Sequence, residues 1–204
     1  MRAMTNSLMS KAELTRAQIV DSAVEMARHA GLESLTIGAV AERAGLSKSG
    51  VFSRLGSREE LQMAALKEYE RRFIEQVIAP SLREPRGLPR MRELLRRWLQ
   101  RMADTDTQGG CLFASGAFEY DDRPGSMRDA VVEGLQQMRR HLARTVQQAV
   151  DEGQLRPQLD ADELAFSICS LMLGVHHDTR LFGEKRAAAW AEASLERLLA
   201  AYAA

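Results

Sequence analysis

Four basic side chains occur within one short stretch of the sequence that contains no acidic residue. They are Arg43, Lys48, Arg54 and Arg58. Such a positive strip indicates contact with phosphate, because lysine and arginine neutralise phosphate charge and arginine can donate two parallel hydrogen bonds. The whole chain balances 28 lysine and arginine residues against 28 aspartate and glutamate residues. This balance excludes a basic protein that coats nucleic acid without selectivity, but it leaves binding to specific DNA sites open.

The basic stretch coincides with the spacing of a helix-turn-helix. Apolar residues at i, i+3, i+4 and i+7 from Ile37 predict a short helix, with Thr36 as its N-cap. Gly45 supplies the positive φ that the turn needs, and Ser47 caps a second helix that ends near Leu55. This unit leaves the outer face of its second helix free to enter a DNA major groove. The alternative is an ordinary helical corner with a solvated, charged face.

The segment TIGAVAERAGLSKSGVFSRLGSREELQMAAL resembles the DNA-binding segment of TetR/AcrR-type bacterial regulators, and the resemblance covers roughly residues 14–66. It implies an all-α fold in which three helices form a DNA-reading head and a fourth is a connecting rod. It also implies a divergent C-terminal domain for ligand and dimer contacts. We therefore expect a flexible arm at 1–12, a helix-turn-helix domain at 13–57, and an effector-binding and dimerisation domain at 58–204.

The predicted contacts with DNA fall on the turn, the second helix and the residues that cap the neighbouring helices. Arg54 and Ser53, together with Lys48 or Ser49, are candidates for base edges. The helix N-termini at Thr36, Ser47 and Arg58 favour contacts with phosphate. The predicted DNA-binding residues are Thr36, Ser47, Lys48, Ser49, Gly50, Phe52, Ser53, Arg54 and Arg58.

Three residues depart from the family pattern. Phe52 replaces the customary tyrosine and loses a hydroxyl that usually reaches phosphate. It could contact a thymine methyl group or pack against the protein. Arg54 replaces a histidine and gains a bidentate donor suited to guanine, while Leu55 replaces a packing phenylalanine. These changes keep DNA binding but leave the operator sequence unpredictable.

Helix-forming residues dominate the chain and strand signals are absent, so we expect helices almost throughout. The first helix is expected from Thr15, in a capping box with Gln18, to Gly31. The fourth is expected from Ser57 to about Ile78, followed by a proline-rich break. The remaining helices are expected near residues 90–102, 110–120, 126–152, 160–181 and 184–202.

The C-terminal half contains no P-loop, GxSxG or HExxH motif, so no enzymatic activity and no cofactor are predicted. The resemblance implies instead a pocket between the fourth and about the eighth helix. A mixture of methionine and aromatic residues suits a small hydrophobic effector, although at helical spacing such residues can equally form core. The candidate lining residues are Met91, Leu95, Trp98, Met102, Cys111, Phe113, Phe118, Tyr120, Met138, His141, Phe166 and Met172.

The two cysteines, Cys111 and Cys169, lack CxxC spacing, which argues against a disulfide scaffold or structural zinc and fits a reducing cytoplasm. Cys111 lies at a predicted helix start, where a thiol can become reactive, or it is a small buried residue. Neighbouring His176 and His177 point about 100° apart on a helix, so no metal site is predicted.

The apolar run at 165–175 and an apolar stripe on the last helix predict an isologous homodimer through the last two helices. The stripe consists of Ala188, Ala191, Leu195, Leu198, Leu199 and Tyr202. No apolar run reaches the length of a membrane span, and no signal peptide is apparent, so we expect a cytoplasmic protein without a membrane partner.

These features together predict a ligand-responsive repressor. We expect it to bind a near-palindromic operator as a dimer and to be released by a small hydrophobic effector. One alternative is a ligand-binding or thiol-based sensor with weak or altered DNA recognition. The other is an enzyme that uses Cys111 and His141, although no sequence motif supports it.

Overall fold

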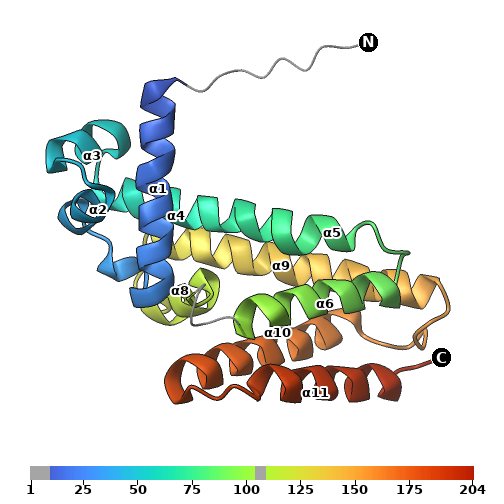
Figure 1. The fold of residues 1–204 in the computed structure, drawn as a ribbon. Helices are drawn as coiled ribbons and strands as arrows, with labels where there is room; N and C mark the ends of the chain where they lie inside the picture. Colours follow the sequence, from blue (N-terminus) through green and yellow to red (C-terminus); the bar gives the residue numbers. More distant parts are fainter. Residues whose placement is uncertain (1–9, 104–108) are drawn as a thin grey trace, which may run out of the picture.

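The structure, a computed structural model, describes residues 10–103 and 109–204. Within these ranges the chain is helical and contains no strand, which confirms the all-helical prediction (Figure 1). In chain order the elements are α1 (Lys11–Ala30), η1 (Leu32–Ser34), α2 (Ile37–Ala44), α3 (Lys48–Leu55), α4 (Arg58–Phe73), η2 (Ile74–Ile78), α5 (Ala79–Ser81), α6 (Leu88–Ala103), α8 (Leu112–Tyr120), α9 (Ser126–Asp151), α10 (Ala161–His177), η3 (Asp178–Phe182) and α11 (Ala187–Ala201).

Helices α1, α2 and α3 form a head at one end of the molecule, and α4 runs from this head into a helical body (Figure 1). In the body α9 contacts α4, α6, α8 and α10, so it is the central helix. Helix α11 packs against α6 and α10 on the side away from α4 (Figure 1). The head is therefore connected to the body by a helix that belongs to both.

Helix α1 begins at Lys11, four residues before the start predicted at Thr15. The Ser10 hydroxyl accepts a hydrogen bond from the Glu13 amide (3.2 Å), and the Glu13 carboxylate accepts one from the Ser10 amide (2.7 Å). This capping box pairs two amides that a helix start otherwise leaves free. The Thr15 hydroxyl instead donates to the Lys11 carbonyl inside the helix. The arm predicted at 1–12 is thus wrong for its last residues, and its first nine lie outside the described residues.

The helix-turn-helix has the predicted boundaries and caps. The Thr36 hydroxyl accepts from the Ala39 amide (3.1 Å) at the start of α2, and the Ser47 hydroxyl accepts from the Gly50 amide (3.0 Å) at the start of α3. Gly45 between the helices has φ +67°, in the left-handed region that a side chain disfavours. The spacing of capping residues and glycine was therefore sufficient to locate both helices.

The connecting rod is longer than predicted. Helix α4 starts at the predicted capping box of Ser57 and Glu60. It widens into the π-helical η2 and continues through α5 to Ser81, so Pro80 lies inside the rod rather than after it. Proline inside a helix removes one backbone hydrogen bond, and here it directly follows the wider π-helical turn of η2.

The hydrophobic core of the head includes residues of the body. Leu112, Tyr120, Met127 and Val131, from α8 and α9, are buried in the same cluster as the core side chains of α1 to α4. A second cluster fills the body between α6, α9, α10 and α11. The boundary predicted after residue 57 therefore falls within a shared core.

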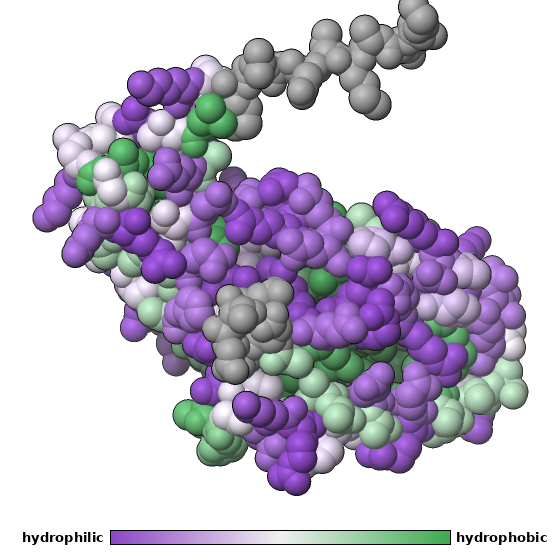
Figure 2. Space-filling model, in the orientation of Figure 1, coloured by the Kyte–Doolittle hydropathy of each residue, from purple (hydrophilic) through white to green (hydrophobic). Residues whose placement is uncertain are grey.

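Hydrophilic residues cover most of the face of the body drawn in Figure 2, and they also line the outer edge of the end that holds α2 and α3. Among the described helices, none has both the length and the apolar character needed to cross a membrane.

Candidate functional site

Helix α3 presents a polar face to solvent and an apolar face to the head. Val51 is fully buried and Leu55 nearly so, which fixes the helix against its neighbours. Around the rest of the helix Lys48, Ser49, Ser53 and Arg54 are exposed. No other described segment covers this face, so the side chains predicted to read bases are accessible together.

Arg54 is held against its own helix in the free protein. Its Nη1 donates to the Gly50 carbonyl (2.9 Å) and lies 3.5 Å from the Ser53 hydroxyl, which itself donates to the same carbonyl (3.0 Å). These contacts are exposed, so exchanging them for a base edge changes the free energy little. Arg54 can therefore extend into a groove without disrupting the fold.

Phe52 is 61% exposed. Its ring lies on the solvent side of α3 and is not part of the head core. Of the two roles considered for Phe52, the position favours an apolar contact outside the protein over packing within it.

Arg58 has partners within the protein. Its Nε donates to the Leu35 carbonyl (2.8 Å) and its Nη2 to the Glu33 carboxylate (3.0 Å). Tyr120 also donates to Glu33 (2.7 Å), and these hydrogen bonds hold the pKa of Glu33 below its usual value, Tyr120 having the larger effect. The predicted phosphate contact of Arg58 must therefore compete with its role in joining α4 to η1.

Glu119, near the end of α8, caps the 3₁₀ turn η1 of the head. Its carboxylate accepts hydrogen bonds from the amides of Leu32 (3.2 Å) and Glu33 (2.7 Å). Gly31 permits this approach: it has φ +86°, and a Cβ atom there would lie 2.4 Å from the carboxylate. The body thus contacts the head immediately before the helix-turn-helix.

The start of α8 is also attached to the head. The Gly110 amide donates to the Arg28 carbonyl (2.7 Å), and the Arg28 Nε donates weakly to the Gly110 carbonyl (3.4 Å). At Gly109, with φ +65°, a Cβ atom would lie 2.9 Å from the Arg28 backbone. The segment before α8 therefore contacts the end of α1, and Glu119 near the other end of α8 contacts η1, which follows α1.

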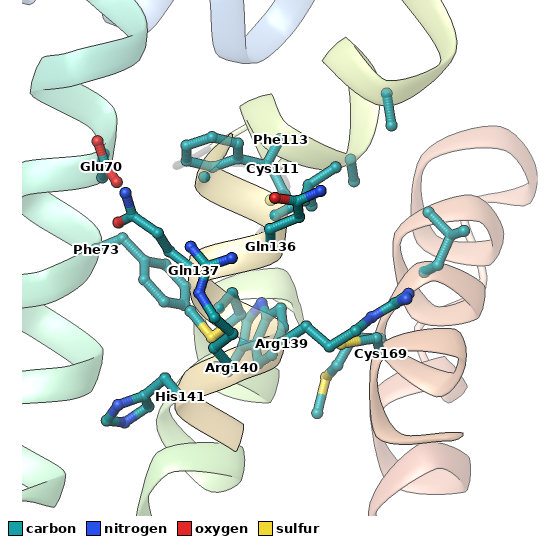
Figure 3. A pocket seen from close by; sticks show the side chains of 18 of the residues that line it. Glu70, Phe73, Cys111, Phe113, Gln136, Gln137, Arg139, Arg140, His141 and Cys169 are labelled. Carbon is teal, nitrogen blue, oxygen red and sulfur yellow. The ribbon is translucent and has the colours of Figure 1, made fainter. Parts of the chain in front are cut away.

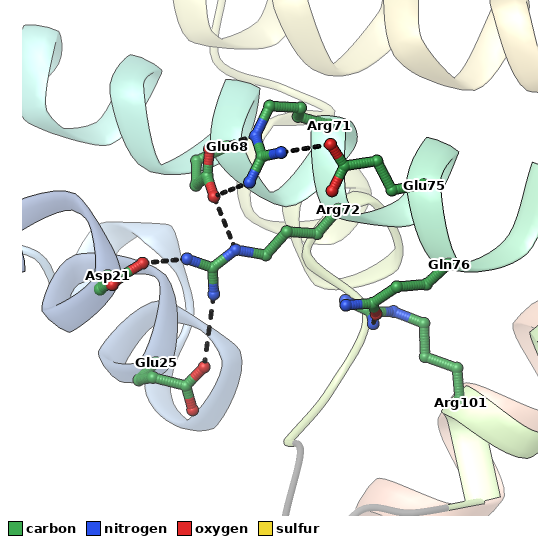
Figure 4. Close-up of polar contacts among 8 residues, drawn as sticks. All are labelled: Asp21, Glu25, Glu68, Arg71, Arg72, Glu75, Gln76 and Arg101. Carbon is green, nitrogen blue, oxygen red and sulfur yellow. Dashed lines mark hydrogen bonds and ion pairs between the residues drawn. The ribbon is translucent and has the colours of Figure 1, made fainter. Parts of the chain in front are cut away.

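Ion pairs connect the rod to α1. Arg72 of α4 pairs with Asp21 and, at 3.9 Å, with Glu25 of α1 (Figure 4). Glu68 accepts hydrogen bonds from Arg72 (2.7 Å) and Arg71 (2.7 Å), and the two guanidinium groups lower the pKa of Glu68 to about 2. This network stabilises the angle at which α1 crosses α4.

A cavity of about 770 Å³ lies in the body, with walls from α4, α6, α8, α9 and α10. Figure 3 shows Phe73 of α4, Cys111 and Phe113 at α8, and Arg139 and Arg140 of α9 around it. Its volume is within the range of small-molecule sites. Eight of the twelve predicted residues line it: Trp98, Met102, Cys111, Phe113, Met138, His141, Phe166 and Met172.

The other four predicted residues lie elsewhere. Met91 and Leu95 are buried in the core of the body, and Tyr120 is bonded to Glu33. Phe118 is 60% exposed on α8. Helical spacing alone does not distinguish a side chain that faces a cavity from one that faces a neighbouring helix, which is why these four were included.

The structure adds lining residues that the sequence reasoning missed. Some belong to the rod and to α10, and others are polar residues of α9, a class that the predicted mixture of methionine and aromatic residues does not include. Only the additions on α9 had a signal in the sequence, namely their spacing from Met138 and His141 along one helix. The main additions are Glu70, Phe73, Ile74, Ile78, Leu135, Gln136, Gln137, Arg139, Arg140, Arg144, Cys169, Ser170 and Leu173.

The last two helices expose a different set of residues from the predicted stripe. Ala191, Leu195 and Leu199 of α11 are buried against the body, so they cannot face a second chain. This corrects the prediction, which took the buried side of α11 for its outer side. The large apolar residues exposed on α10, η3 and α11 are Phe166, Leu173, Leu181, Phe182 and Trp190.

A helix-turn-helix with an exposed, basic second helix, joined to a helical body with a cavity, defines the chain as a DNA-binding regulator of the helix-turn-helix class. The family comparisons agree. The model of bacterial regulatory proteins of the tetR family matches residues 19–65, and that of the tetracyclin repressor-like C-terminal domain matches residues 87–195. The second match alone covers more than half of the chain, so the chain belongs to the TetR family of transcriptional regulators.

Solved structures show the same fold along nearly the whole chain. A TetR-family regulator from Chloroflexus aurantiacus is 23% identical, with a TM-score of 0.83 over 96% of this chain and 98% of that one. One from Cytophaga hutchinsonii is 21% identical, with a TM-score of 0.81 over 97% and 98%. One from Streptomyces coelicolor is 19% identical, with a TM-score of 0.81 over 98% and 97%. A comparison with curated proteins finds no match.

Proposed function

We propose that this TetR-family regulator is a repressor that binds a near-palindromic operator as a homodimer and releases it when a small molecule enters the body cavity. The observation that carries the DNA-binding half is the exposed face of α3. Lys48, Ser49, Ser53 and Arg54 lie there together on a helix fixed by buried Val51. Donors arranged on one such face suit the edges of bases in a major groove.

Dimerisation is supported by the exposed apolar residues of the last helices. Leu181, Phe182 and Trp190 are each at least half exposed, and Leu173 is 38% exposed. Large apolar side chains in this number on one region mark an interaction surface. We assign the dimer contact to this region of α10, η3 and α11, and a two-fold axis there would present two heads to one duplex.

The release step is supported by α8, because this helix contacts both the cavity and the DNA-binding head. Cys111 and Phe113 line the cavity, while Glu119 of the same helix caps η1. A ligand that displaces the Phe113 ring moves the helix that holds the end of α1. The cavity and the DNA-binding face of α3 are then coupled through α8. The ligand and DNA favour different positions of the head, so binding of one weakens binding of the other.

Glu119→Ala tests this coupling in the absence of any ligand. The variant leaves the amides of Leu32 and Glu33 without their acceptor, and loss of a partly buried hydrogen bond to a carboxylate costs about 1–3 kcal/mol. We expect hydrogen exchange at these two amides to accelerate roughly 5- to 150-fold by the same free energy. Glu192→Ala, at an exposed site on α11, should leave both rates unchanged. Unchanged exchange rates at these two amides in Glu119→Ala would contradict the proposed coupling between α8 and the head.

The function itself is tested by selecting fragments of the organism's own DNA with the full-length protein. The proposal expects an enriched sequence with two related halves centred about 10 base pairs, or a multiple of one helical turn, apart. It also expects the sequence to overlap a promoter. Enrichment of single, unpaired half-sites would contradict the dimer, and no enrichment would contradict operator binding.

A further inference from the structure

Three arginines at the cavity lack the acidic partners that several other arginines of this protein have. Arg139, Arg140 and Arg144 of α9 all line the cavity and are exposed. None of them forms an ion pair within the described ranges. By contrast, Arg72 of α4 pairs with Glu68, and Arg97 of α6 pairs with Glu93. The cavity therefore has a concentration of unneutralised positive charge.

The spacing of these arginines along α9 adds to the unfavourable positive charge at the cavity. Arg140 and Arg144 are four residues apart, so they lie on the same side of the helix, where like charges destabilise it. Glu70 of α4 is the one acidic residue among the lining side chains of the described chain, against three arginines. An anion near these guanidinium groups would relieve their repulsion, whereas a cation would increase it. Arg139 also lies 5.6 Å from the centroid of the Phe166 ring, which holds it at the cavity.

Two further polar atoms at the cavity have no hydrogen-bond partner within the described part of the chain. They are Nε1 of Trp98 and Nε2 of His141, and the Trp98 side chain is only 8% exposed. Burial, together with the charges of Arg144 and Arg90, lowers the pKa of His141, which favours its neutral form. A pure hydrocarbon would leave these atoms unpaired at a cost, whereas a ligand with oxygen atoms can accept from the indole N–H.

Most of the remaining cavity wall is apolar, with Gln136, Gln137 and Ser170 as its other polar residues. Phe73 packs edge-on against Trp98, with ring centroids 5.6 Å apart, and Met102, Met138 and Phe113 extend this surface. Flexible methionines beside aromatic rings adapt to alkyl or aryl groups of varied shape. The cavity thus combines an apolar wall with a cationic rim.

From this combination we infer that the cavity binds an amphipathic monoanion, a carboxylate with an alkyl or aryl body, whose charged group lies at the cationic rim that Arg139, Arg140 and Arg144 form. This inference rests on the proposed function for its regulatory meaning, and it narrows the expected hydrophobic effector to one chemical class. Recognition combines burial of the apolar body with charge-assisted hydrogen bonds to guanidinium groups.

The test measures the affinity of the full-length protein, without DNA, for three ten-carbon probes that differ in their polar group. Calorimetry with decanoate, decan-1-ol and decylamine isolates the effect of charge at constant chain length. We expect decanoate to bind at least tenfold more tightly than decan-1-ol, and decylamine to bind more weakly than either. One charge-assisted hydrogen bond is sufficient for such a ratio.

Substitutions of the arginines test whether they cause the preference for decanoate. In R139Q/R140Q/R144Q the preference for decanoate over decan-1-ol should fall to about twofold or less, while decan-1-ol binds as before, which also shows that the variant is folded. The matched control R83Q/R86Q/R197Q removes three exposed arginines away from the cavity and should keep the full preference.

The inference is overturned if decan-1-ol or decylamine binds as tightly as decanoate, if no probe binds, or if the triple variant keeps its preference. Failure of the proposed function appears differently. Decanoate that binds with the predicted preference but leaves the affinity for selected DNA unchanged would support the anion site and contradict its role in release.

Discussion

Leu112→Ala should lower the free energy of unfolding by about 2–5 kcal/mol, the largest effect expected of a single substitution here. Leu112 belongs to α8 of the body, yet it is fully buried in the core of the head. Its truncation leaves a cavity between α8 and the helices that hold α3. Because the two parts share this core, we expect one cooperative transition, shifted to lower denaturant concentration.

The control for this prediction is Leu82→Ala, since Leu82 is 50% exposed after α5 and its truncation should cost no more than about 0.5 kcal/mol. Chemical denaturation followed by circular dichroism measures both variants. If Leu112→Ala unfolds with two separate transitions and an unchanged second midpoint, then the head and body are independent and the shared core does not couple them.

Arg54→Ala should weaken binding to the selected operator by about 1–3 kcal/mol and relax the preference at one base position in each half-site. Arg54 is exposed on α3 and reaches the groove by exchanging hydrogen bonds to the Gly50 carbonyl and Ser53. Its bidentate geometry is suited to guanine. The measurement is a binding titration against the operator and all three substitutions at every position.

Arg43→Ala is the matched control, because Arg43 lies exposed at the end of α2 and not on α3. It should weaken binding to every sequence alike, as expected for a contact with phosphate. If Arg54→Ala instead lost affinity equally for all operator variants, Arg54 would be a phosphate contact and base reading would depend on the other residues of α3.

The head was predicted from sequence because its signals are local. Thr36, Gly45 and Ser47 each fix one boundary through a cap or a positive φ, and such requirements depend on a few neighbouring residues. The start of α1 was missed because Thr15 and Ser10 both begin acceptable capping boxes. Only the structure shows that Ser10 forms one, with Glu13.

The cavity and the coupling were less predictable because they depend on contacts between distant segments. Nothing in the sequence around Glu119 indicates that its carboxylate caps η1. The Leu32 amide that it accepts from is 87 residues away along the chain. Likewise, the arginines of α9 read as an ordinary charged face until the packing places them at a cavity. The apolar stripe of α11 was recognised, but its orientation toward the body or a partner is decided only by the neighbouring helices.

The central claim is that the exposed face of α3 binds DNA, and the salt dependence of that binding tests it most directly. If Arg43, Lys48 and Arg54 of each protomer neutralise phosphate charge, the logarithm of the association constant should fall linearly with the logarithm of salt concentration, with a slope of about −5 for a dimer. K48A/R54A should bind more weakly and with a shallower slope. Affinity that does not respond to salt, or an unchanged slope in the double variant, would contradict the assignment of this face.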